Sequence, residues 1–302
     1  MSGKKGPILT VIIILGIAVL FLGALMTINL AFFGPSTNLP FGNNMGVLSI
    51  EGTITESQSI VSQLVNFRKD SGIKAIILRI NSPGGGVSPS QEIYREVRRT
   101  VNTKKVIVSM GSLAASGGYY IASAADKIVA SPGTITGSIG VIMEFVQLKE
   151  LFKKIGISLE ILKSGEYKDV GSPHREMSER DKELLQELIS DIQNQFVEAV
   201  AEGRGLSVEK VREIADGRIF SGAKAMELGL VDMLGNFQDA VDLAKQETGI
   251  DGEITLVYPR KSRNRLWDLI LGDAIKAIYE SALKALETRI EYRWDGLPYA
   301  LD

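Results

Sequence analysis

The chain has 302 residues, of which 45% are apolar and 23% are charged, and its formal net charge is −2. It contains one histidine and no cysteine, so cysteine-ligated zinc sites, cysteine proteases and disulfide frameworks are excluded. A near-neutral chain with a pI of about 5.7 lacks the basic surface that holds phosphate backbones, and we expect no nucleic-acid partner.

The first predicted element is an uncharged apolar run over residues 8–33, preceded by Lys4 and Lys5. At about 1.5 Å per residue, a helix of this length reaches roughly 39 Å and can cross a bilayer. A cleaved signal peptide is the alternative, but its apolar core is usually only about 7 to 15 residues and ends at a small-residue cleavage site. We therefore expect residues 1–33 to form a single-pass anchor in the cell membrane. The two lysines predict a cytoplasmic N-terminus and an extracytoplasmic remainder.

After a predicted linker over residues 34–44, short β-rich runs alternate with helical patterns. Strands are expected near 47–50, 75–80, 106–108 and 128–130, and helices near 57–68, near 88–101 and from 116 onward. Repeated βα units of this length predict a mainly parallel sheet flanked by helices.

The second half of the chain begins with a long amphipathic helix, predicted over residues 177–203 with Ser178 as its N-cap. A strand at 255–257 and a helix over about 264–288 are expected to follow. The apolar face of that last helix predicts that the helix packs in the core or at a subunit interface. A helix lying on the membrane surface is less favoured, since its acidic residues would be repelled by anionic lipid. We place the main domain at residues 45–245 and a C-terminal extension at 246–302.

Two segments after predicted strands combine glycine with small hydroxyl residues. Residues 81–86 read NSPGGG, and bare glycine N–H groups can donate to a developing negative charge, although a tight turn would explain the glycines equally well. Residues 111–120, GSLAASGGYY, place Ser116 between two small neighbours at a predicted helix start, where it is either an accessible nucleophile or an ordinary N-cap.

A nucleophilic serine needs a base, and the sequence offers three candidates. His174, the lone histidine, lies in a polar turn and is expected on the surface. Residues 163–169, KSGEYKD, contain Lys163 and Lys168, and composition alone does not choose between them. A lysine serves as a general base only when its pKa falls from about 10.4 toward roughly 7 or 8 through desolvation and nearby dipoles.

Together with residues 136–141, TGSIGV, these segments occur in the order that is typical of the signal peptide peptidase A family, which this chain resembles over residues 45–245. The resemblance implies a fold of crotonase/caseinolytic-protease-like repeated ββα units, an α/β class, preceded by the transmembrane helix. It implies a serine endopeptidase in which Ser116 is the nucleophile, Lys168 is the base and Ser138 hydrogen-bonds the lysine amine. The oxyanion donors would be the N–H groups of Gly117 and Gly84, with Gly85 as an alternative to Gly84.

The resemblance further implies a ring-shaped homo-oligomer that cleaves signal peptides at the membrane without a metal or cofactor. Whether the Ser and Lys of one site come from one protomer or from two is left open. Three other functions compete with this hypothesis: a membrane protease of the kind that cleaves stomatin-like partners, a crotonase-like acyl-CoA enzyme, and a non-catalytic membrane scaffold.

Overall fold

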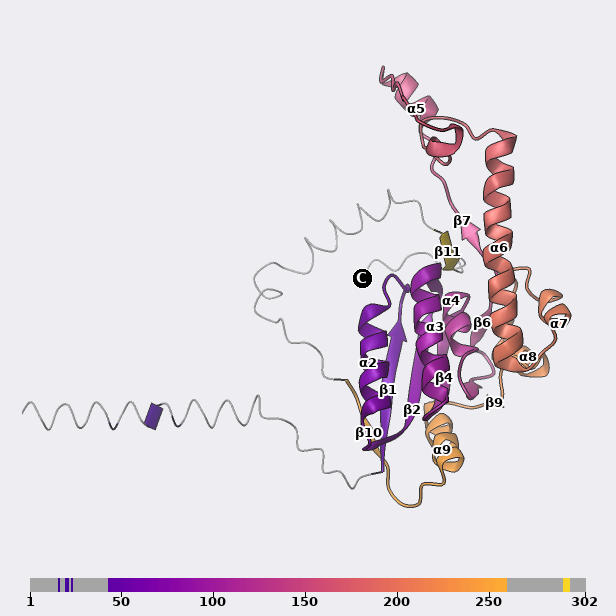
Figure 1. Ribbon diagram of the computed structural model, residues 1–302. Helices are drawn as coiled ribbons and strands as arrows, with labels where there is room; N and C mark the ends of the chain where they lie inside the picture. Colours follow the sequence, from indigo (N-terminus) through magenta and orange to yellow (C-terminus); the bar gives the residue numbers. More distant parts are fainter. Residues whose placement is uncertain (1–15, 17–19, 22, 24–42, 260–289, 294–302) are drawn as a thin grey trace, which may run out of the picture. The chain divides into compact units, whose positions relative to one another are not determined.

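The structure is a computed structural model, and it describes residues 16, 20, 21, 23, 43–259 and 290–293 (Figure 1). The chain divides into two compact units, Met1–Phe41 and Gly42–Asp302. The predicted anchor lies almost entirely outside the described residues, as does the predicted helix at 264–288. Within the described ranges, no helix is both long enough and apolar enough to cross a membrane.

The second unit is built on a sheet in which nearly every pair of neighbouring strands is parallel. Its main path runs in the order β10-β1-β2-β4-β5-β9, and β6 extends it beside β4, with β8 antiparallel to β6. The strands are β1 (Asn44–Glu51), β2 (Ile73–Ser82), β4 (Lys105–Ala115), β5 (Lys127–Ala130), β6 (Ile135–Gly137), β8 (Ile219–Ser221), β9 (Met233–Leu234) and β10 (Thr255–Val257). The predicted α/β class with a mainly parallel sheet is confirmed.

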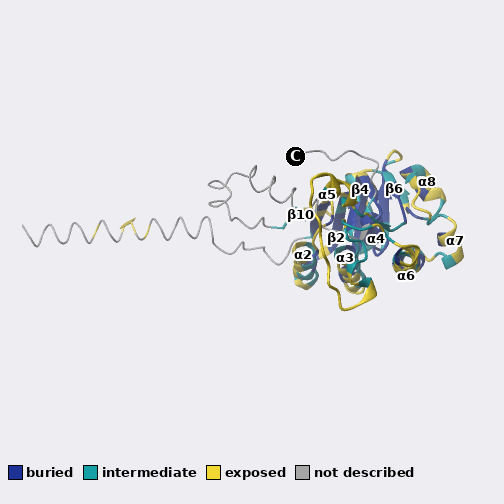
Figure 2. Ribbon diagram, turned by 90° about the horizontal axis from the view of Figure 1, so that it is seen from above, coloured by how far each residue is buried: buried dark blue, intermediate teal, exposed yellow. Residues whose placement is uncertain are grey.

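Helices cover both faces of this sheet. Figure 2 shows α2, α3 and α6 along one face, while α9 packs on the other through its buried residues Ala240, Val241 and Ala244. The helices are α2 (Gln58–Lys69), α3 (Val87–Val101), α4 (Gly117–Ala122), α5 (Lys149–Lys154), the 3-10 helix η1 (Glu166–Asp169), α6 (Glu179–Arg204), α7 (Val208–Arg212), α8 (Gly222–Glu227) and α9 (Phe237–Thr248).

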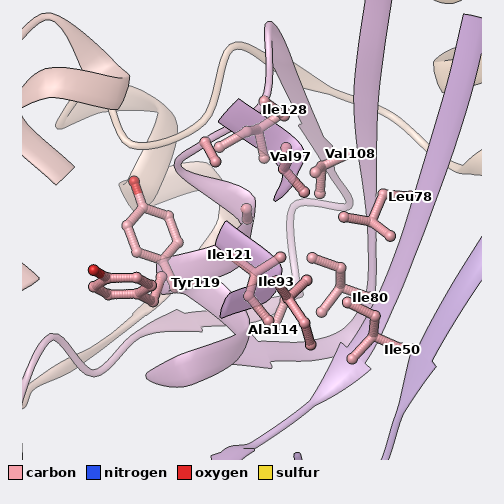
Figure 3. Close-up of a cluster of buried hydrophobic side chains, with 14 of the residues drawn as sticks. Ile50, Leu78, Ile80, Ile93, Val97, Val108, Ala114, Tyr119, Ile121 and Ile128 are labelled. Atoms are coloured by element: carbon pink, nitrogen blue, oxygen red, sulfur yellow. The ribbon is translucent and has the colours of Figure 1, made fainter. Parts of the chain in front are cut away.

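Alternate residues of each strand point to opposite faces, which produces two core clusters. In β2, Ile76 and Leu78 join the cluster under α3 and α4, whereas Ala75 and Ile77 join the cluster under α9. Figure 3 shows the first cluster, where side chains of the strands meet those of α3 and α4. Burial on both faces explains why the sequence of these strands is continuously apolar rather than alternating.

Local signals placed β1, β2, β5, β10 and the start of α6, but they made no prediction for β6, β8, β9 or α9, and one predicted strand differs in length. The helix predicted from residue 177 begins after Ser178, whose side chain accepts a hydrogen bond from the Asp181 N–H in a capping box. The strand predicted to end at residue 108 instead continues as β4 to Ala115. Gly111 lies in this extension because a Cβ there would meet the Asn81 side chain at 2.7 Å, so the glycine marks a close approach and not a turn.

A second, smaller sheet lies at the carboxyl end of β2. It has three antiparallel strands in the order β3-β11-β7: β3 is Gly84–Gly86, β11 is Ile290–Arg293 and β7 is Ile142–Met143. Between β7 and α6 the chain makes an excursion, residues 144–178, which we call the arm. Figure 1 shows the arm, including α5, beyond the N-terminal end of α6.

Candidate active site

Ser116 lies at the turn where β4 ends and α4 begins. Its backbone is strained, with φ of 53° and ψ of −118°, and it is held by a 2.8 Å bond from its N–H to the Gly137 carbonyl. Although Ser116 occupies the N-cap position, its hydroxyl does not cap the helix. The side chain is fully buried, and among the described residues its Oγ has no hydrogen-bond partner. A strained serine with an uncommitted hydroxyl suits a nucleophile better than an N-cap.

Ser138 follows the neighbouring strand β6 in the same way that Ser116 follows β4. The parallel register pairs Ala115 with Gly137, so the two serines leave adjacent positions of the sheet. Ser138 also has a positive φ, 50°, and its N–H donates to the Arg218 carbonyl at 2.8 Å. Strands in a sheet lie about 4.8 Å apart, and the fold therefore brings Ser116 and Ser138 together.

The predicted oxyanion glycines also meet at this turn. Gly84 has φ of 104°, and a Cβ added to it would lie 2.7 Å from the Gly117 amide nitrogen, so only glycine fits. The Gly84 N–H already donates to Ser82 Oγ at 3.1 Å, a buried serine whose role the sequence did not suggest. The opposite edge of β3 bonds to Ile54, which accepts from the Gly86 N–H and donates to the Gly84 carbonyl, both at 2.8 Å.

The two candidate lysines have different surroundings on the arm. Lys163 Nζ donates to Asp169 Oδ1 at 2.8 Å, and Arg175 donates to the same oxygen at 3.0 Å. Hydrogen bonds from Arg175 and Lys163 lower the pKa of Asp169 to about 2. Lys168 is exposed on η1, and within the described ranges its amine has no hydrogen bond or ion pair. Lys163 is thus held in an ion pair with the Asp169 carboxylate, whereas the Lys168 amine is available to act as a base.

Ser116 and Lys168 of one chain are not hydrogen-bonded to each other. The Ser116 hydroxyl is buried in the body where β4 meets α4, whereas Lys168 belongs to η1 on the arm. His174, the other candidate base, is half-buried on the arm and its ring contacts Ser172 Oγ at 2.8 Å. The structure therefore assembles Ser116, Ser138 and the glycines in the body, and it places every candidate base elsewhere.

Strand β11 lies beside the glycines next to the serine, and no sequence pattern predicted it. Its register pairs Tyr292 with Gly85 and Arg293 with Gly84. Beside Ser138, a surface pocket of about 410 Å³ is lined by Arg293 and by residues of α6, including Gln193. The Gln193 Nε2 donates to the Ala215 carbonyl at 2.7 Å, which fixes one wall of the pocket.

The fold and the serine–glycine arrangement define an α/β protein of the Clp protease type, whose family profile matches residues 44–134. A second profile, Peptidase family S49, matches residues 98–251, and the chain belongs to this family. The resemblance to the signal peptide peptidase A family is thereby confirmed.

Three relatives illustrate the range of similarity. The chain is 50% identical over 177 residues to a protein of Synechocystis sp., covering 59% of this chain and 64% of the relative. It is 38% identical over 214 residues to a protein of Methanocaldococcus jannaschii, and the match covers 71% of this chain and 69% of that relative. It is 33% identical over 264 residues to the chloroplastic serine protease SPPA of Arabidopsis thaliana, with 84% of this chain but only 39% of that protein covered. The match to the first relative thus spans less than two thirds of its length.

Proposed function

We propose that the protein is a serine endopeptidase in which Ser116 is the nucleophile. The observation that carries this proposal is the state of Ser116: buried, in a strained backbone conformation, with a hydroxyl that has no partner among the described residues. Such strain and such an uncommitted polar group are costly, and they persist chiefly where a site requires them.

The oxyanion would rest on two backbone donors, one of which is the Gly117 N–H at the first turn of α4. For the second donor we propose Gly85 instead of Gly84. The Gly84 N–H is already bonded to Ser82 Oγ, whereas Gly85 pairs in register with the strand that runs along β3. Backbone N–H groups of this kind stabilise the charge that develops on a carbonyl oxygen during attack.

The general base would be Lys168 of a neighbouring copy. In one chain Lys168 is exposed on the arm and makes no bond to the buried Ser116. The arm also exposes apolar side chains at alternate positions, a pattern that indicates a surface covered by another subunit. These residues are Ile155, Ile157, Leu159 and Ile161, which are 58%, 48%, 54% and 41% exposed. A ring of copies would cover this stripe and bring each Lys168 to the serine of its neighbour.

The reaction would proceed as two acyl transfers. The Lys168 amine takes the proton of the Ser116 hydroxyl, whose oxygen attacks a peptide carbonyl and forms a tetrahedral oxyanion. Collapse breaks the peptide bond, and the proton passes from Lys168 to the leaving amine. Water then attacks the acyl ester with Lys168 again as the base, which releases the acid and regenerates Ser116. Ser138, beside Ser116, would accept a hydrogen bond from the lysine amine and orient its lone pair.

The substrates we propose are cleaved signal peptides and other membrane-associated peptides. This proposal combines membership of the S49 family with the apolar run at residues 8–33, which would tether the catalytic body beside the bilayer on its extracytoplasmic side. No metal or cofactor is required by a Ser/Lys mechanism.

Complementation between two inactive variants tests both the chemistry and the shared site. Ser116→Ala and Lys168→Ala chains are expressed separately and together, purified in mild detergent and assayed with a fluorogenic peptide. Each variant alone is expected to be inactive, and random mixing in a ring should restore about a quarter of the wild-type rate. Lys154→Ala, an exposed lysine of the same arm, is the matched control and should keep full activity.

Two results would contradict the proposal in different ways. Unchanged hydrolysis by Ser116→Ala or Lys168→Ala would exclude the dyad. Inactivity of the co-expressed pair, with both single variants folded and assembled, would place Ser116 and Lys168 of one site in the same chain.

A further inference from the structure

The 3-10 helix η1 is tied at both ends by one lysine. Lys163 Nζ donates to the carbonyl of Glu166, the first residue of η1, at 2.9 Å and to the carboxylate of Asp169, the last, at 2.8 Å. Lys168 lies between these two points, so the amine of Lys163 holds the turn that carries Lys168. The side chain of Lys168 itself stays exposed.

Helix α6 contacts η1 from the other side. The Arg180 guanidinium, in the first turn of α6, lies over the ring of Tyr167 with its carbon 5.6 Å from the ring centroid, which is within the range of a cation–π interaction. Tyr167 directly precedes Lys168 in the chain. The contact therefore orients η1 relative to the start of α6, but an exposed cation–π contact is weak and does not fix a position by itself.

Arg175 joins η1 to α6 through two carboxylates. Its Nη2 donates to Asp169 Oδ1 at 3.0 Å, and its Nη1 donates to Asp181 Oδ2 at 2.6 Å. A planar guanidinium holds its donors in a fixed fork, so it sets the separation of the two carboxylates in a way that an ammonium group does not. Asp181 is a firm partner because it is buried and its Oδ2 also accepts from the Ser178 N–H at 2.9 Å.

The far end of this bridge is anchored in the body. Asp181 is part of α6, and the same helix packs in the core through Ile192, Phe196 and Val200. Any displacement of η1 from α6 is therefore a displacement of Lys168 from the body. In a ring the bodies of neighbouring copies are fixed against each other, so the bridge also sets the place of Lys168 relative to the next serine site.

Both carboxylates of the bridge are ionised at neutral pH. Hydrogen bonds from Arg175 and from the Ser178 N–H hold the pKa of Asp181 below its usual range, as those from Arg175 and Lys163 do for Asp169. Two cations and two carboxylates leave the bridge with no net charge. It can thus hold Lys168 in place without adding net charge beside an amine that must be neutral to act as a base.

We propose that Arg175 is a positioning residue for Lys168. Its bridge between Asp169 and Asp181 sets the place of η1 against α6, and with it the place of the lysine amine. The inference rests on the proposed function, in which Lys168 is the base. A base must come within about 2.6–3.2 Å of the atom whose proton it takes, and a misplacement of about 1 Å can cost about 100-fold in rate.

The kinetics of Arg175→Ala test the proposal in the full chain, purified in mild detergent and assayed with a fluorogenic peptide. The expected result is a fall in kcat of about 100-fold, while KM changes little because the body that binds the peptide is intact. Arg175→Lys keeps the charge but cannot bridge both carboxylates as a fork does, and it should fall between Arg175→Ala and the wild type.

Arg68→Ala is the matched control for the loss of an ion pair. Arg68 bonds to Glu96 at 2.7 Å and joins α2 to α3; the two side chains are 27% and 4% exposed, against 28% and 5% for Arg175 and Asp181. Both variants remove an arginine from a buried carboxylate and should lower the free energy of unfolding. Only Arg175→Ala should lose kcat, and an equal loss of kcat in both variants would overturn the proposal.

Complementation shows which half of the site Arg175 serves. Co-expression of Arg175→Ala with Ser116→Ala should restore about a quarter of the wild-type rate, since mixed sites then combine an intact serine with an intact arm. Co-expression with Lys168→Ala should give no more than the residual rate of Arg175→Ala, because neither chain supplies an intact arm. The reverse pattern would assign Arg175 to the serine and overturn the proposal.

The single variants separate this inference from the proposed function. If Lys168→Ala leaves hydrolysis unchanged, the proposed base is wrong and the positioning role falls with it. If Lys168→Ala abolishes hydrolysis but Arg175→Ala keeps the wild-type kcat, the base stands and the positioning role fails. If Ser116→Ala and Lys168→Ala do not complement each other, the shared site fails, and the contrast in kcat between Arg175→Ala and Arg68→Ala still decides the role of Arg175.

Discussion

Replacing Ser116 is expected to make the protein more stable while it abolishes hydrolysis. The serine combines φ of 53° with a buried hydroxyl that has no partner within the part of the chain that the structure describes. Alanine removes the hydroxyl and keeps the backbone strain, whereas glycine removes both. Comparing the two substitutions therefore separates the effect of the buried hydroxyl on the free energy of unfolding from the effect of the strained backbone.

The magnitudes follow from these two features. A buried polar group without a partner costs about 1–3 kcal/mol, so Ser116→Ala should raise the free energy of unfolding by about 1 kcal/mol after the small loss of packing. A strained φ/ψ costs a further 1–3 kcal/mol or so, offset by about 0.5–1 kcal/mol for the greater freedom of glycine in the unfolded chain. Ser116→Gly should thus gain about 1–3 kcal/mol in total.

Urea unfolding of the full chain in mild detergent, followed by circular dichroism, measures these differences. Ser123→Ala is the matched control: this serine is equally buried, but its Oγ donates to the Tyr120 carbonyl at 2.7 Å, so its loss should lower the free energy of unfolding by about 1 kcal/mol. If Ser116→Ala and Ser116→Gly were as destabilising as Ser123→Ala, the hydroxyl would not be uncommitted and the reasoning about strain at the nucleophile would be refuted.

Two other predictions concern packing and pH. Gly203→Ala in α6 would place a methyl group against the Ser123 carbonyl oxygen and should lower the free energy of unfolding in urea by about 1–3 kcal/mol. The pKa of Asp169 is lowered to about 2 by Arg175 and Lys163, so its stabilising contribution is complete above about pH 4 and is lost as the pH falls through about 2. Pepsin should therefore cut the arm increasingly over that range, and Asp169→Asn should remove the pH dependence.

Local signals in the sequence were sufficient for five of the eight strands of the main sheet, β1, β2, β4, β5 and β10, and for part of the site, but not for β6, β8 and β9. Apolar runs marked β1, β2 and β4, and the Ser178–Asp181 capping box marked the start of α6. The adjacency of Ser116 and Ser138 could not be derived in the same way, because it depends on the register that pairs Ala115 with Gly137. Composition likewise could not distinguish Lys163 from Lys168, because the two lysines differ in a contact of the folded chain: Lys163 forms an ion pair with Asp169 and Lys168 does not.

The strand β11 was beyond sequence reasoning for a physical reason. It has only four residues, and two of them, Glu291 and Arg293, are charged. The segment therefore contains no apolar run from which a strand could be predicted. Its partners in β3 and β7 are far away along the chain. Pairing of this kind is determined by the open backbone edges that the rest of the fold creates, and short strands of mixed polarity carry little propensity of their own.

The glycine strand β3 has a consequence for the physical state of any substrate. It offers backbone groups, and a polypeptide that adds to it must be extended over several residues, as β11 is. An apolar peptide inside a bilayer satisfies its own backbone as a helix, and unwinding it in hydrocarbon exposes polar groups at a cost of several kcal/mol each. Peptides that unravel easily at the water interface would thus be degraded first, while stable membrane helices in the same bilayer would be spared.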